Sequence, residues 1–206
     1  LVNLTDSPSE DRFPAWSPDG SRIAFTSDRG DSFDVWGMNA DGSNPVNLTN
    51  TPGRDRYGMW SPDGTRIAFN TGRDGNQEIY VMNADGSQPT NVTQTPDAEE
   101  GLADWSPDGK RLVLYHNGNG NKDIYVLDLT TGGWTNITNH PANDEFCTWA
   151  PELQDGSMLC HPYLAPGLPC SFLSAETGPT ALARGSLGDV WRPVFPESRQ
   201  GDCQPA

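Results

Sequence analysis

Short apolar runs separated by turn sequences follow one another along this chain. The run RIAF occurs at residues 22–25 and again at 66–69, and RLVL takes its place at 111–114. Ile23 and Phe25 alternate with Ala24, which is the two-residue period of a strand packed on both faces. The sequence SPDG precedes each run and favours a tight reversal, because proline presets φ and glycine accepts a positive φ. The pattern predicts antiparallel strands joined by hairpin turns.

The strands belong to a repeat marked by tryptophan. The four tryptophans at 16, 60, 105 and 149 are spaced by 44, 45 and 44 residues. Each is preceded by an Asn-x-Thr sequence, and the first three are followed by a loop of Asp, Asn and Gly and by DVWGMN, EIYVMN or DIYVLD. A period near this length, rich in strands, is typical of propeller blades. A single four-stranded sheet cannot hide both apolar faces, so the repeated tryptophan is interpreted as a packing residue between blades.

The words WSPDGSRIAF, DGNQEIYVMNADGS and NLT resemble the WD-like repeats of the TolB β-propeller family. The resemblance covers residues 1 to about 140 well and the fourth repeat loosely. It implies an all-β fold and functions ranging from periplasmic protein binding to the propeller lid of a peptidase. We therefore expect one β-propeller domain over residues 1–206, made of four-stranded antiparallel blades. The expected blades are 13–49, 57–94, 102–138 and 146–183, with terminal strands at 1–5 and 190–195.

The two terminal strands do not complete one another. The first is of the outermost kind and the last of the innermost kind, so a blade built from both would lack its two middle strands. Either the ring has about four blades, or the terminal strands pair elsewhere. Pairing with a second copy would be β-strand addition and, repeated head to tail, would build a fibre.

Composition narrows the partners and the compartment. A formal net charge of −15 opposes a nucleic-acid backbone, and no apolar window is long enough to insert into a membrane. Four cysteines, Cys147, Cys160, Cys170 and Cys203, favour two disulfides with three connectivities possible, or else remain thiols. Disulfides indicate an oxidising compartment, so we expect a periplasmic or secreted protein. The start at Leu1 fits a processed chain or a fragment.

The loop after each second strand carries side-chain oxygens at alternate positions with glycine between them, as a calcium loop requires. The predicted ligands are Asp28, Asp31, Asp34, Asp74, Asn76, Glu78, Asn119, Asn121 and Asp123. The spacing is not that of an EF-hand, because no glutamate arrives at the twelfth position. The alternative is a turn in which Asp and Asn side chains bind backbone amides.

An acidic residue stands five positions before each tryptophan: Asp11, Asp55, Glu100 and Asp144. The connection that carries it should emerge on the same face as the Asp- and Gly-rich loops, with Arg29 and Arg73 within reach. Two interpretations are open. The carboxylates could form ion pairs that lock neighbouring blades, or they could form a ring around a metal ion.

Little in the chain points to catalysis. There is no G-x-S-x-G sequence, and His116, His140 and His161 share no metal-ligand spacing. We therefore expect a non-enzymatic extracytoplasmic module that binds a protein partner or is structural, stabilised by calcium. The alternatives are a fibre subunit assembled from copies of itself and a metal-dependent lyase or hydrolase.

Overall fold

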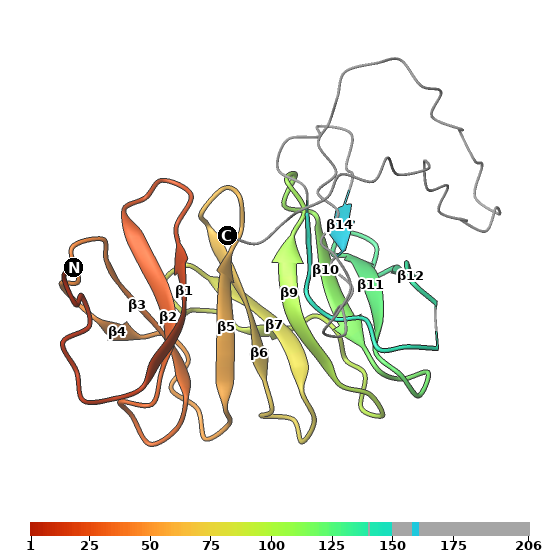
Figure 1. The fold of residues 1–206 in the computed structure, drawn as a ribbon, viewed down its shortest axis with the longest axis horizontal. Helices are drawn as coiled ribbons and strands as arrows, with labels where there is room; N and C mark the ends of the chain where they lie inside the picture. The colour runs from red at the N-terminus through yellow and green to blue at the C-terminus, as the bar shows by residue number, and fades with distance from the viewer. Residues whose placement is uncertain (140, 150–157, 161–206) are drawn as a thin grey trace, which may run out of the picture. The chain divides into compact units, whose positions relative to one another are not determined.

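The computed structural model describes residues 1–139, 141–149 and 158–160, all within one compact unit that spans Leu1–Leu168. The described part is all-β (Figure 1). The first sheet contains β1 (Asp11–Trp16), β2 (Arg22–Ser27), β3 (Asp34–Asn39) and β4 (Val46–Asn47). The second contains β5 (Asp55–Trp60), β6 (Arg66–Thr71), β7 (Glu78–Asn83) and β8 (Thr90–Asn91). The third contains β9 (Glu100–Trp105), β10 (Arg111–His116), β11 (Asp123–Asp128) and β12 (Trp134–Asn136). A further pair is β13 (Cys147–Trp149) and β14 (Met158–Cys160).

Each of the three complete sheets is an antiparallel meander in chain order, which confirms the predicted propeller blades. We call them blades 1, 2 and 3, and the β13–β14 pair begins blade 4. The remainder of the expected fourth blade and the terminal strand at 190–195 lie outside the described residues. The structure assigns no strand to residues 1–5, where a terminal strand was expected.

The SPDG turns form as their chemistry predicts. In the first, Gly20 has φ of 70° and donates its N–H to the Ser17 carbonyl at 2.9 Å. The Ser17 hydroxyl donates to Asp19 at 2.6 Å, and the Arg22 N–H donates to the Ser17 hydroxyl at 2.9 Å. Together with a second serine, Ser21, these bonds hold the pKa of Asp19 at about 2. The turn thus fixes the register of β1 against β2.

The first strand of a blade is interrupted by a bulge. The register of β1 with β2 shifts between Arg12 and Ala15, and that of β5 with β6 shifts between Arg56 and Met59. Phe13 lies in the first bulge with φ of 51°, and Tyr57 lies in the second with φ of 58°. Positive φ is a true outlier for a bulky residue, so both aromatic side chains are held in an unusual direction.

Adjacent blades pack through the tryptophans at the ends of their first strands. Trp60 and Trp105 are only 9% and 4% exposed, and each packs in a core shared with the preceding blade. The Trp60 indole N–H donates to the Ala15 carbonyl at 3.2 Å, and the Trp105 indole N–H donates to the Met59 carbonyl at 3.0 Å. Adjacent blades thus seal one another's apolar faces.

The start of blade 4 places two cysteines opposite one another. In the antiparallel pairing of β13 with β14, Cys147 is the register partner of Cys160. Cys170 and Cys203 lie outside the described residues. Among the residues that the structure describes, no helix has the length and apolar character needed to cross a bilayer.

Candidate functional site

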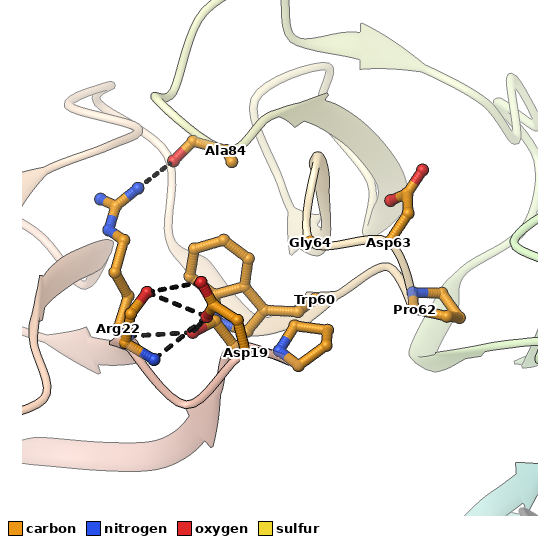
Figure 2. Close-up of a pocket in the computed structure, with 10 residues that line it drawn as sticks. Asp19, Arg22, Trp60, Pro62, Asp63, Gly64 and Ala84 are labelled. Carbon is orange, nitrogen blue, oxygen red and sulfur yellow. Dashed lines mark hydrogen bonds between the residues drawn. The ribbon is translucent and has the colours of Figure 1, made fainter.

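A shallow pocket lies between blades 1 and 2, beside their SPDG turns (Figure 2). Its polar groups are already engaged. The Arg22 guanidinium lies 5.4 Å from the centre of the Trp60 ring and donates to the Ala84 carbonyl at 2.9 Å. The carboxylate of Asp63 accepts from the Ser61 hydroxyl at 2.6 Å. We interpret this pocket as part of the contact between blades, because its walls are bound to each other.

The carboxylates five residues before the tryptophans each meet a base. Arg29 Nη2 lies 3.0 Å from Asp11 Oδ1, and Arg73 Nη2 lies 3.1 Å from Asp55 Oδ2. The side chain of Asp55 is fully buried, and its Oδ1 has no hydrogen-bond partner among the described residues. The Arg73 guanidinium also lies over the Tyr80 ring, 4.7 Å from its centre. Blades 1 and 2 therefore contain the same buried carboxylate–arginine lock.

Blade 3 replaces that lock with a glutamate and a histidine. His116 Nδ1 lies 2.6 Å from Glu100 Oε1, and the Glu100 side chain is fully buried. Burial raises the pKa of Glu100 above its ordinary value, although hydrogen bonds from Thr95 and His116 oppose the shift. The His116 ring packs against Tyr125 and Trp134, at 5.0 and 5.4 Å between ring centres. The aromatic support of the arginines thus has a counterpart here.

These ion pairs lie within single blades, so the expectation that their side chains lock neighbouring blades was wrong. The contact between neighbours is made instead by the backbone of the same acidic residues. The Asp55 N–H donates to the Phe33 carbonyl at 2.7 Å, and the Asp144 N–H donates to the Lys122 carbonyl at 2.7 Å. The reason is geometric: β1 and β2 are paired, with Asp11 opposite Ser27, so the loop after β2 returns its arginine to the carboxylate of its own blade.

The predicted calcium ligands are engaged in hydrogen bonds within their loops. Asp34 Oδ2 and Asp123 Oδ2 accept from the Asn47 and Asn136 amides, each at 2.8 Å. Glu78 accepts from the Thr93 hydroxyl at 2.7 Å. The other bonds are Glu10 N–H to Asp28, Asn91 amide to Asp74, Asn76 amide to the Ala98 carbonyl, Asn119 amide to the Tyr125 hydroxyl and Asn121 amide to Asp123. Asp31 is exposed.

Across the described residues, no three His, Cys, Asp or Glu side chains gather as metal ligands would. The structure brings Asn76 to Glu78 and Asn121 to Asp123, but it does not join one loop to another. These contacts match the alternative in which side chains stabilise turns.

Calcium binding by these loops stays a prediction. If the loops bind the ion, the melting temperature should rise on addition of calcium chloride and fall on addition of chelator, because a ligand that binds only the folded state stabilises it. Differential scanning calorimetry with magnesium chloride as the control measures this. An unchanged melting temperature in both directions would contradict calcium binding.

A second group of side chains lies on the first strands near the loop after β2. We call Arg12, Phe13, Phe33, Arg56 and Tyr57 the inner cluster. The Phe13 and Tyr57 rings are 4.3 Å apart between centres. The guanidinium carbons of Arg12 and Arg56 lie 5.6 and 5.4 Å from the centre of the Phe33 ring. Two cations and three aromatic rings are thus brought together by two neighbouring blades.

The inner cluster is accessible. Phe13 is 41% exposed, and Phe33, Arg56 and Tyr57 are partly exposed. Arg12 pairs with Glu10, whereas no ion pair within the described part of the chain involves Arg56. Sequence reasoning missed this cluster. The available signal was an apolar residue three positions before each tryptophan, preceded by arginine in the first two repeats.

Comparison with known proteins gives the same architecture. The family model of the Tricorn protease N-terminal beta propeller domain matches residues 33–118. The solved structure of TolB from Acinetobacter baumannii is 24% identical, covers 79% of this chain and 40% of its own, and has a TM-score of 0.62. A putative TolB from Agrobacterium tumefaciens is also 24% identical, with coverages of 68% and 56% and a TM-score of 0.57.

The chain has a TolB-like β-propeller fold. It spans about half or less of the length of these two TolB structures. An oligogalacturonate lyase from Vibrio parahaemolyticus has the fold as well, at 17% identity, with coverages of 70% and 45% and a TM-score of 0.57. The TolB-like fold therefore includes both TolB and an enzyme, and function has to be argued from the residues of this chain.

Proposed function

We propose that this TolB-like propeller is a non-catalytic, extracytoplasmic module that binds a protein partner through the inner cluster. The observation that carries the proposal is the pair of aromatic residues, Phe13 and Tyr57, held at positive φ in successive blades and stacked at 4.3 Å. Unusual backbone conformations of this kind concentrate at functional sites, where the surrounding structure maintains them.

The composition of the inner cluster favours a protein as the ligand. Aromatic residues and arginine are enriched at the centres of protein interfaces and dominate their binding energy. The two guanidinium groups stand out on a chain whose net charge is −15, so the complementary partner segment should carry a carboxylate beside an apolar side chain. The resemblance to TolB, which implies periplasmic protein binding, supports the same class of partner.

The extracytoplasmic location is supported by the cysteines. Residues directly opposite one another in an antiparallel pair have the separation that a disulfide requires. We therefore propose that Cys147 and Cys160 are joined, since they are register partners. Such a bond persists in an oxidising compartment. The lyase in the comparison supports a catalytic alternative only at the level of fold, because the inner cluster has no carboxylate pair or histidine.

The binding proposal predicts a large loss of affinity when the arginines are removed. A photo-crosslinking amino acid at position 57 identifies the partner in a periplasmic or culture extract, and the same probe at Asp128 is the control. Titration calorimetry with the purified partner then compares Arg12→Ala/Arg56→Ala with the parent chain. We expect affinity to fall by roughly 30-fold or more, as for interface residues whose removal costs about 2 kcal/mol.

Lys110→Ala is the matched control, because it removes an exposed cation away from the inner cluster. It should leave affinity unchanged. Adducts that form equally at positions 57 and 128, or unchanged affinity in the double arginine variant, would overturn the proposal.

A further inference from the structure

The first six residues of the chain repeat the geometry of an outer strand. Asn3 Oδ1 accepts from the Thr5 and Asp6 N–H groups at 3.2 and 3.4 Å. In blade 1, Asn47 Oδ1 accepts from the N–H groups of Thr49 and Asn50 at 3.1 and 3.0 Å. Asp6 and Asn50 both have positive φ, of 39° and 41°. Residues 1–6 therefore have the local structure that ends a blade.

These residues also occupy an outer strand's place against the next blade. A Cβ built on Gly42 would lie 2.5 Å from the Leu4 carbonyl oxygen, and one built on Gly86 would lie 2.6 Å from the Leu48 carbonyl oxygen. Leu4 packs on the Ile23–Phe25–Met38 cluster of blade 1, and Leu48 lies in the corresponding cluster with blade 2. Leu4 is thus to blade 1 what Leu48 is to blade 2.

The partner strand that a complete blade would supply is what differs. Asn47 donates its amide to Asp34, the first residue of β3, and the Val35 N–H donates to the Thr49 hydroxyl at 3.1 Å. The same pair of contacts recurs at Asn91 and Thr93 and at Asn136 and Thr138. The structure describes no third strand beside Asn3 and Thr5. Their sequence is therefore fitted to a strand that begins with an acidic residue.

Trp16 shows the same incompleteness on the face of blade 1. It is 57% exposed, whereas Trp60, Trp105 and Trp149 are at most 9% exposed. Each of those three lies under an arginine of the preceding blade: Arg22 over Trp60, Arg66 over Trp105 and Arg111 over Trp149. The arginine always stands six residues after the tryptophan of its own blade.

We infer that residues 1–6 are the outer strand of a further blade and that the face bearing Trp16 binds the other three strands of that blade. The occupant has the chemistry of this repeat: an acidic residue that begins its third strand and contacts Asn3 and Thr5, and an arginine six positions after its tryptophan that covers Trp16. The argument is continuity with the interface that joins blade 1 to blade 2 and blade 2 to blade 3. The inference does not depend on the proposed binding function.

The test adds such a unit to the full chain. A second copy of residues 52–88 placed before Leu1 supplies three strands of blade 2 and leaves Leu1–Asp6 as the fourth, since Asn3 then takes the position of Asn91. Hydroxyl-radical footprinting with mass spectrometry measures oxidation of Trp16, with Trp105 as the internal standard. We expect the rate at Trp16 to fall by about five-fold, toward that of Trp105. Arg66→Met in the added copy alone should restore part of the reactivity.

A second fusion, with a copy of residues 97–133 before Leu1, guards against misfolding of the first, and circular dichroism reports whether the added strands form. Unchanged Trp16 oxidation in a folded fusion would overturn the inference. So would protection of Trp16 in the parent chain. Protection lost on removing residues 161–206 would identify the chain's own end as the occupant, and protection that rises with concentration would identify a second copy.

Discussion

Replacing Trp105 with alanine should lower the free energy of unfolding by about 3–5 kcal/mol, as expected for a large buried aromatic residue. Trp105 is 4% exposed, packs between blades 2 and 3, donates to the Met59 carbonyl and lies under Arg66. Urea denaturation followed by circular dichroism measures the loss. The reason for the large effect is that one side chain closes the faces of two sheets.

Trp16→Ala is the matched control for that experiment. It removes the same side chain from the same position of the repeat, but Trp16 is 57% exposed, so we expect a loss of less than about 1 kcal/mol. Similar losses for the two variants would show that tryptophan stabilises each blade by itself rather than by contact between blades.

Removal of Arg73 should be the second most damaging change, with a loss of about 3 kcal/mol. Arg73→Ala leaves the Asp55 carboxylate fully buried without its cation, and breaking a buried ion pair from one side is strongly destabilising. Asp55→Asn/Arg73→Met should recover most of the loss, because it removes both charges and keeps the volume. Chemical denaturation of the three proteins measures this.

Arg12→Ala serves as the control for the ion pair. Arg12 and its partner Glu10 are about half exposed, and exposed pairs contribute less than about 1 kcal/mol. A loss for Arg73→Ala no larger than for Arg12→Ala would contradict a structural role of the buried lock.

The repeat itself could be predicted because its determinants are local. The SPDG turns, the alternation of Ile23 and Phe25 with Ala24 and the spacing of the tryptophans each depend on a few consecutive residues. The carboxylate–arginine pairing was also predicted in part: Arg29 and Arg73 reach Asp11 and Asp55. Whether such a pair lies within or between blades depends on strand register, which the sequence pattern does not reveal.

The inner cluster could not be predicted, for two physical reasons. Phe13 and Tyr57 meet because a bulge turns both side chains out of the alternation that a regular strand would impose. Phe33 joins them from a loop, at a position that is Gln77 and Lys122 in the next repeats. A residue that departs from its repeat carries no periodic signal, and only coordinates place it beside Arg12 and Arg56.

Two glycines in blade 3 show how its lock is built. A Cβ on Gly118, the position held by Arg29 and Arg73 in the other blades, would lie 2.6 Å from Nε2 of His116. A Cβ on Gly101 would lie 2.5 Å from the Tyr115 hydroxyl. Histidine and arginine therefore exclude one another in this space. Conversion of one kind of blade into the other requires coordinated replacement of several side chains, and each intermediate that changes only one of them is either crowded or left with an uncompensated charge.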